Sequence, residues 1–341
     1  MHPTDLQTTW FVLLGAVWTL YLVLGGADLG VGMVLRRVDR RTALRSIGPT
    51  WAANDVWLVI AVAATLGAVP GWYASWTSGL YVPLTVLLGA LMLRHAAIEL
   101  VDHAGPVAAR RWTAVLVGSS VVLAFGWGVV WAAALDGSLA RGGDGGLGVL
   151  SPTTALAGLA SVALCRVQGI AFLRLRVPSF RPALGLVRSA VAAATLTTAA
   201  TIVLALDAAD DVSAGALGLT ALAVAGCALV ALVAEAVRGR DGRSLAAAAV
   251  ATTATVVALF ATLWPSPVAG RGPGAVALAD AASGPTTLTA MLVVALVLLP
   301  PLLGVLGFAY VRFLRSPDGA PAGGIGALVA RATRGTLKEL G

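Results

Sequence analysis

Four carboxylates and one imidazole draw attention because they lie in or beside long apolar runs. Asp28 is inside the first run, Asp55 enters the second, Glu99 closes the third, and Asp102 and His103 follow it. Ionisable side chains are costly in a bilayer unless they are paired or hydrated. Carboxylates whose pKa is raised by desolvation can relay protons at neutral pH, and a nearby imidazole can share the proton. The pattern predicts a water-holding cluster that takes up protons.

A structural interpretation of the same carboxylates stays open. They could cap helices, or pair with Arg36, Arg45 and Arg94 near the membrane surface. Asp28 stands eight residues before Arg36, which is about 12 Å along a helix at about 1.5 Å per residue. Glycines flank Asp28, so a neighbouring helix or a file of water could approach it closely.

Arg166 is a cation inside a predicted span. Its long side chain could reach back to the cytoplasmic surface. Alternatively it holds a carboxylate, an acidic group of a partner, or a lipid, and Glu235 is one candidate.

The elements that must position these side chains are predicted to be transmembrane helices. With 58% hydrophobic residues, 11% charged residues and a mean hydropathy of +0.90, the chain is no ordinary soluble domain. A span needs about 20 apolar residues. We predict spans at 10–35, 51–69, 80–99, 112–135, 152–172, 190–206, 214–237, 245–264 and 286–313. An aromatic belt is expected where Trp72, Tyr73, Trp76 and Tyr81 gather at one membrane surface.

The basic residues predict the orientation. Twenty of the 23 Lys and Arg residues fall in alternate gaps between spans, and only Arg141 and Arg271 fall in the others. Because Lys and Arg concentrate in cytoplasmic loops, the N-terminus is predicted outside and the C-terminus in the cytoplasm. The net charge of +7 is then a topology signal, and we expect no nucleic-acid partner.

Several chemistries have no residues to support them. There is no CxxCH haem-attachment motif, no pair of intramembrane histidines, no P-loop and no nucleophile–base set. The two cysteines cannot form a thiolate metal site. We therefore expect no catalytic residue and no metal site in this chain.

The sequence resembles subunit II of the cytochrome bd-type quinol oxidases over nearly its whole length. The segment GADLGVGM at 26–33 is similar to the family's GFDFGVGM. The segments IGPTW at 47–51 and NDVWL at 54–58 resemble its IGPxWDGNEVWL. Further matches are LRHAAIE at 93–99, LSP at 150–152, QG at 168–169 and AASGP at 281–285.

This resemblance implies an all-α fold of nine helices within one transmembrane domain spanning 1–341. It comprises two four-helix bundles, approximately 8–135 and 150–264, a last helix at 286–313 and a cytoplasmic tail at 314–341. The chain would pair with a larger subunit I that holds haems b and d and the quinol site, in a bacterial plasma membrane. It would bind no haem, although some members bind a structural quinone, and small single-helix accessory subunits are a further partner class. The candidates for structural, lipid or quinone contacts are Trp51, Asn54, Trp57, Arg94, Arg166 and Gln168.

Three departures from the family pattern bear on a proton path. Gly25, Ala52 and Val101 stand where the family has an acidic residue, an Asp and an Arg. The function expected is scaffolding of subunit I, with proton supply through Asp28, Asp55 and Glu99 as a further hypothesis. Two alternatives stay open: a diverged secondary transporter that uses Arg166 and Asp28, and a purely structural paralogue.

Overall fold

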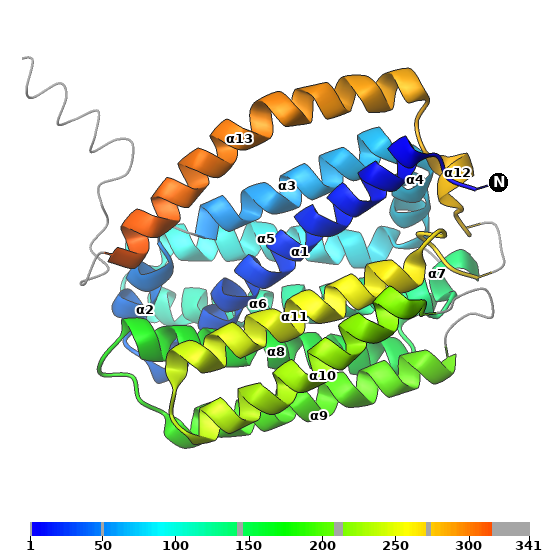
Figure 1. The fold of residues 1–341 in the computed structure, drawn as a ribbon. Helices are drawn as coiled ribbons and strands as arrows, with labels where there is room; N and C mark the ends of the chain where they lie inside the picture. The colour runs from blue at the N-terminus through cyan, green and yellow to red at the C-terminus, as the bar shows by residue number, and fades with distance from the viewer. Residues whose placement is uncertain (1, 49–50, 142–145, 208–213, 271–273, 316–341) are drawn as a thin grey trace, which may run out of the picture.

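The computed structural model describes residues 2–48, 51–141, 146–207, 214–270 and 274–315. Within these ranges the chain is helical, and its β-structure is limited to one isolated bridge between Val268 and Val276. Nine of the described helices are long and apolar enough to cross a membrane (Figure 1). Each contains most of one predicted span, so the predicted all-α polytopic fold is confirmed.

The long helices extend beyond several of the predicted spans. Helices α6, α9 and α11 begin four to seven residues early, since the predicted spans were begun after the arginines that lie in the first two turns of these helices. Capping boxes at Thr4 and Ser151 fix the starts of α1 and α8. The bounds are α1 Asp5–Val34, α3 Trp51–Ala68, α5 Tyr81–Leu100, α6 Pro106–Leu135, α8 Pro152–Arg176, α9 Ala183–Asp207, α10 Ala216–Val237, α11 Asp241–Leu263 and α13 Pro285–Arg315.

Short helices that the sequence analysis did not predict connect the long ones. Helix α2, Arg40–Ile47, begins at Asp39, whose carboxylate accepts a hydrogen bond from the Thr42 amide at 2.9 Å. This bond, together with one from the Thr42 hydroxyl, lowers the pKa of Asp39. The other short elements are η1 Leu35–Arg37, α4 Pro70–Gly79, α7 Ser138–Arg141, η2 Leu147–Val149 and α12 Leu278–Ala281.

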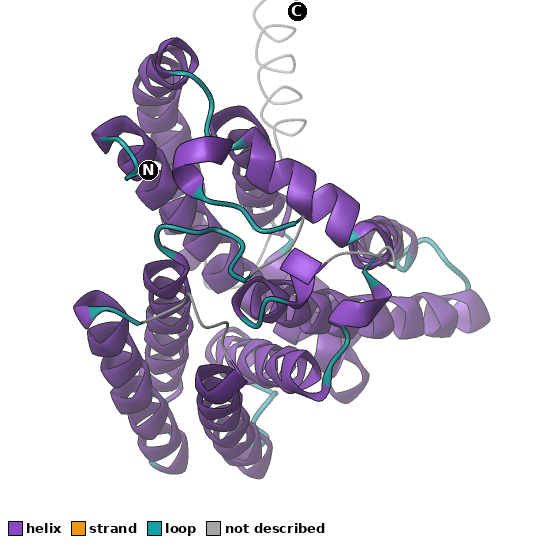
Figure 2. Ribbon diagram, turned by 90° about the vertical axis from the view of Figure 1, so that its right-hand side faces the viewer, coloured by secondary structure: helices purple, strands orange, loops and turns teal. Residues whose placement is uncertain are grey.

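The long helices pack as two groups joined along α8. Helices α1, α3, α5 and α6 are neighbours, as are α8, α9, α10 and α11, and both α1 and α6 also pack against α8. Helix α13 lies along α3 at the edge of the molecule (Figures 1 and 2). In the most apolar 18-residue stretch of α8, 61% of the residues are buried, compared with 6% in the corresponding stretch of α13. Helix α8 is thus the centre of the fold.

Glycines allow the closest of these helix contacts. A Cβ atom on Gly30 of α1 would overlap the carbonyl oxygen of Cys165 in α8, and one on Gly169 would overlap the backbone of Gly30. One turn earlier, Gly26 lies against the side chain of Gln168. Small residues let helix backbones touch in a membrane, where dispersion forces favour tight packing. The glycines around Asp28 therefore serve helix contact.

Five tryptophans form the core of the half that contains the N-terminus. Trp18 packs edge-on against Trp76, Trp127 and Trp131, and Trp72 packs against Trp76 at 5.6 Å. Trp72 and Trp76 are 0% and 5% exposed. The predicted aromatic belt is wrong for these two residues, because helix α4 turns their rings into the protein rather than toward lipid.

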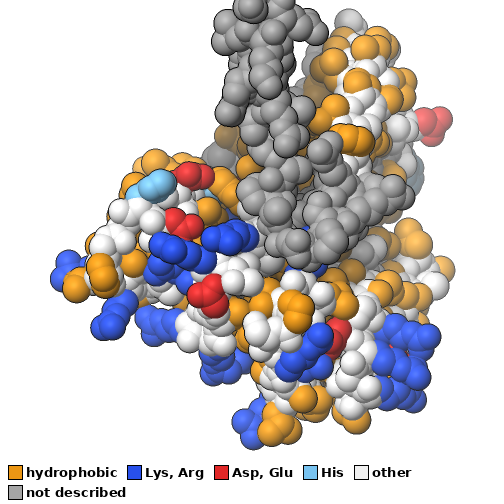
Figure 3. Space-filling view, turned by 90° about the vertical axis from the view of Figure 1, so that its left-hand side faces the viewer, with side chains coloured by type: hydrophobic (Ala, Val, Ile, Leu, Met, Phe, Trp, Pro, Cys, Tyr) orange, Lys and Arg blue, Asp and Glu red, His pale blue; other side chains and the backbone are white. Residues whose placement is uncertain are grey.

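Basic side chains gather at the end of the molecule that carries α2. Figure 3 shows this end, where arginine side chains are spread over the tips of several helices. Of the predicted tail at 314–341, residues 316–341 lie outside the described residues.

Candidate proton site and internal cavity

Asp28 is buried in the protein interior beside a single amide. It is 5% exposed on α1, and Asn54 on α3 is 3% exposed. The Nδ2 group of Asn54 donates to Oδ2 of Asp28 and to the carbonyl oxygen of Leu24, the latter at 3.2 Å. A buried carboxylate without such a donor would be strongly unfavourable. The amide of Asn54 therefore fixes the position of Asp28 between two helices.

Arg94 supplies the positive charge for this carboxylate. The sequence analysis counted it among the loop cations, but the side chain is 2% exposed within α5 and its charge acts on Asp28. Neither its Nε nor its Nη2 has a hydrogen-bond partner among the described residues. A buried cation keeps its charge more readily when a carboxylate lies nearby. Asp28, Asn54 and Arg94 are thus the buried centre of the site.

Asp55 is paired with a histidine that the sequence analysis passed over. Its Oδ2 lies 2.6 Å from Nε2 of His95 on α5, and the imidazole is tilted against the ring of Trp51 at 5.1 Å. The side chains of Asp55 and His95 are 20% and 36% exposed. One signal was available in the sequence: Asn54–Asp55 and Arg94–His95 are both polar dipeptides near those ends of two predicted spans that the arginines predict to be cytoplasmic.

The other acidic candidates lie at the surface of the described chain. Glu99, Asp102 and His103 are exposed, and Asp102 forms a long ion pair of 3.9 Å with Arg40. No hydrogen bond within the described ranges joins any of the three to Asp28. The single five-member cluster predicted from sequence is therefore divided into a buried centre, a half-buried pair and an exposed rim.

Two further candidates are core residues. Trp57 on α3 is 3% exposed and packs in the main apolar core. Gln168 on α8 is 1% exposed, and its Nε2 donates to Oγ1 of Thr252 on α11 at 2.9 Å. Because it also lies against Gly26, Gln168 connects three helices beside the site.

Arg166 is half-buried on α8, and its guanidinium is close enough to Arg37 for their charges to interact. Glu235, suggested above as its partner, instead bonds Arg238 at 2.8 Å and lies 3.5 Å from Arg240. No ion pair in the described part of the chain joins Arg166 to Asp28. The transporter hypothesis, which needs both side chains at one substrate, gains no support.

A buried ion pair, also not predicted from sequence, fastens α8 to α11. Nε of Arg174 donates to Oδ1 of Asp241 at 2.6 Å, and both side chains are less than 10% exposed. Arg181 adds a bond to Asp241 at 3.1 Å and another to the Arg174 carbonyl oxygen at 2.8 Å. This network lies at the same end as the proton site.

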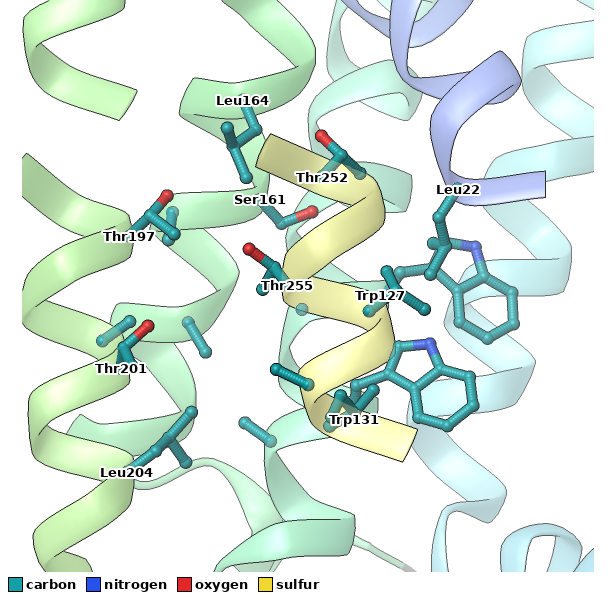
Figure 4. Close-up of a pocket in the computed structure, with 18 of the residues that line it drawn as sticks. Leu22, Trp127, Trp131, Ser161, Leu164, Thr197, Thr201, Leu204, Thr252 and Thr255 are labelled. Atoms are coloured by element: carbon teal, nitrogen blue, oxygen red, sulfur yellow. The ribbon is translucent and has the colours of Figure 1, made fainter. Parts of the chain in front are cut away.

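A cavity of about 460 Å³ lies between the two helix groups. Hydroxyl groups of Thr197 and Thr201 on α9 lie across it from Ser161 on α8 and Thr255 on α11 (Figure 4). The indoles of Trp127 and Trp131 on α6 lie on the opposite side of this view from α9. Its other lining groups include Tyr21, Gly25, Gly26 and Gln168. Apolar walls with a few hydroxyl and amide groups suit a largely apolar ligand that carries polar oxygens.

Known proteins share both sequence and fold with this chain. Residues 6–313 match the family described as cytochrome bd terminal oxidase subunit II. Cytochrome bd ubiquinol oxidase subunit 2 of Bacillus subtilis is 32% identical over 187 residues, which are 50% of this chain and 54% of that protein. Cytochrome bd-I ubiquinol oxidase subunit 2 of Escherichia coli is 32% identical over 190 residues, 50% of this chain and 49% of its own length. The chain thus spans about half the length of the curated relatives it matches.

The fold is similar to a chain in the structure of bd oxidase from Geobacillus thermodenitrificans. The TM-score is 0.64 at 12% sequence identity, and the match covers 92% of this chain and 99% of that one. Nine apolar helices together with the family match identify a multi-pass protein of the bacterial plasma membrane. Among the described residues no three His, Cys, Asp or Glu side chains gather as a metal site would require. Since the family match covers nearly the whole sequence, the chain belongs to the cytochrome bd terminal oxidase subunit II family.

Proposed function

We propose that this chain is the haem-free subunit of a quinol:oxygen oxidoreductase and that it scaffolds a haem-bearing subunit I. The match to the subunit II family over residues 6–313 is the observation that carries this proposal. The partner would supply the redox chemistry through haems b and d. This chain would support the partner's fold, shield its haems from lipid and admit protons. Small accessory subunits would bind at its remaining lipid-facing helices.

The proposed orientation places the α2 end of the molecule in the cytoplasm. Support comes from the arginine distribution in the sequence and from the basic side chains that cover this end in Figure 3. Asp28, Asp55 and Arg94 then lie in the cytoplasmic half of the bilayer. Protons for oxygen reduction would be taken from this side.

The proposed proton role rests on the buried centre of the site. Asp28 has one amide donor and one nearby guanidinium, and Arg94 leaves two N–H groups without a protein partner. Unfilled donors beside a buried carboxylate are where ordered water is expected. A carboxylate in such surroundings can accept and release a proton without moving the helices, which is what a relay requires.

The cavity is the proposed site of a structural quinone. A volume of about 460 Å³ suits a quinone ring with the first part of its isoprenoid tail. The hydroxyl groups of Thr197 and Thr201 would donate to ring carbonyl oxygens, and Trp127 and Trp131 would offer apolar contact. A bound quinone would fill the space between the helix groups and so stabilise their packing.

Replacement of Asp28 by Asn tests the proton role. The change keeps the size of the side chain but removes the group that titrates, so quinol-dependent oxygen consumption should fall about 100-fold, the lower end of the range for positioned acid–base groups. Haem content and assembly of the purified complex should be unchanged. Asp5→Asn, an exposed carboxylate on the same helix, is the matched control. Wild-type turnover of Asp28→Asn from pH 6 to pH 9 would contradict the role.

A further inference from the structure

We propose that His95 and Asp55 together form the proton-collecting group at the mouth of the Asp28 site. The inference rests on the proposed proton role of Asp28 and adds a residue that the sequence motifs did not single out. Its basis is the contact of 2.6 Å between Nε2 of His95 and Oδ2 of Asp55. These two side chains are partly exposed, whereas the nearby Asp28 is buried.

The geometry follows from two dipeptides that face each other on α3 and α5. Neighbouring residues on a helix point about 100° apart, so one member of each dipeptide is directed inward while the other lies nearer the rim. Asn54 and Arg94 are the buried members, 3% and 2% exposed. Asn54 donates to Asp28, and the charge of Arg94 acts on it. Asp55 and His95 are the outer members, so a proton on this pair is one residue along α3 from Asn54 and one along α5 from Arg94.

The charges around the pair favour a proton-binding function. Asp28 on α1 and Arg94 on α5 are the buried charges, and the charge of Asp55 already acts on Asp28. Glu99 stands one turn beyond His95 on α5 and is exposed, which adds a negative group at the rim. Helix α6, which packs on α5, brings Arg110 and Arg111 to the same membrane surface. Helix α4 carries no charged residue, and α13 carries none over Pro285–Phe308.

The proposed cycle moves one proton and changes no other bond. Imidazole is the side chain that gains and loses charge between about pH 5 and pH 8. The protonated ring donates its Nε2 hydrogen to Oδ2 of Asp55. When that proton passes to the carboxylate, the ring becomes neutral and keeps its Nδ1 hydrogen. Nε2 takes a new proton from water after Asp55 has passed its own proton on. Asp55 then holds the proton that the buried carboxylate receives.

The test uses the complete oxidase complex, with turnover measured from pH 6 to pH 9. His95→Ala should lower turnover about 10-fold at pH 8, less than the ~10²–10⁴-fold effect of fully buried acid–base groups because water also reaches this half-exposed site. The deficit should shrink toward pH 6, where protons are more abundant. Added imidazole should restore the rate, because the substitution leaves space beside Asp55. A merely structural pair would show neither the pH trend nor the rescue.

Two further variants keep the result decisive. His95→Asn retains a hydrogen-bond donor for Asp55 without a titrating group, so it should assemble, show the same deficit and resist rescue by imidazole. His2→Gln removes an exposed histidine just before α1, far along that helix from Asp28, and should leave the pH profile unchanged. If both His95 variants turned over at the wild-type rate while Asp28→Asn was impaired, the role of His95 would be contradicted and that of Asp28 would stand. If Asp28→Asn also turned over at the wild-type rate, the proton role of Asp28 would be contradicted as well.

Discussion

Several buried polar side chains of this protein are held by one or two specific partners. Asp28 accepts from the amide of Asn54, Gln168 donates to the hydroxyl oxygen of Thr252, and Asp241 accepts from two guanidinium groups. In a membrane interior a missing partner would leave a buried polar atom unsatisfied. Replacing such a partner should therefore change the hydrogen bonding of the remaining group before it unfolds the protein.

Filling the cavity with one larger side chain should displace the proposed quinone. Thr201→Phe projects a ring into the space beside Ser161 and Thr255, so the quinone extracted from the purified complex should fall from about one per complex to a few tenths or less. The measurement is chromatography of the organic extract.

Thr220→Phe makes the same exchange at an exposed hydroxyl on α10 and is the control for this experiment. Equal quinone content in the two variants and the wild type would place the quinone elsewhere, or show that the complex carries none.

Some residues of the site were predictable from sequence and others were not. Asp28 and Asp55 were identified because a charge inside an apolar run is rare. His95 was missed because its partner lies on another helix, and hydropathy does not give the rotation of α5 relative to α3. Trp72 was assigned to a lipid-facing belt for a related reason: buried and lipid-exposed surfaces are both apolar in a membrane protein.

At the level of helices, the contact between α1 and α8 holds the two groups together. Their backbones touch at Gly30 and Gly169, with no room for a Cβ atom on either. This contact sets the positions of Asp28 on one helix and Gln168 on the other. The nine long helices of the described residues and their approximate limits followed from the apolar runs. This contact could not be located from sequence, since 40 glycines are available to make it.

Gly30→Ala should separate α1 from α8 and destabilise the protein. Overpacking costs about 1–3 kcal/mol where neighbours can shift, and here the neighbour is backbone rather than a side chain. We expect a lower thermal midpoint in detergent, together with reduced recovery of assembled complex. Fluorescence-detected size-exclusion chromatography after heating would measure both.

Gly226→Ala on α10 is the matched control, because a Cβ atom there meets nothing within 4 Å. It should match the wild type or be slightly more stable, since alanine favours helix over glycine. If Gly30→Ala were as stable as Gly226→Ala, the close contact of α1 with α8 would be contradicted.

In the whole molecule, the proposed functions occupy different regions. The proton site lies between α1, α3 and α5, and the cavity lies where α1 and α6 face α8, α9, α10 and α11. Helix α13 lies outside both, against α3. The proposed scaffold, proton and quinone roles would therefore use different parts of the chain.

The central claim is that the chain works as the haem-free subunit of a bd-type oxidase. The most direct test is gentle purification of the tagged chain from its native membrane, followed by a dithionite-reduced-minus-oxidised absorption spectrum. The account predicts haem b and haem d bands that co-purify with a second, larger membrane subunit. A colourless protein without a partner, isolated from cells that express a bd oxidase, would contradict it.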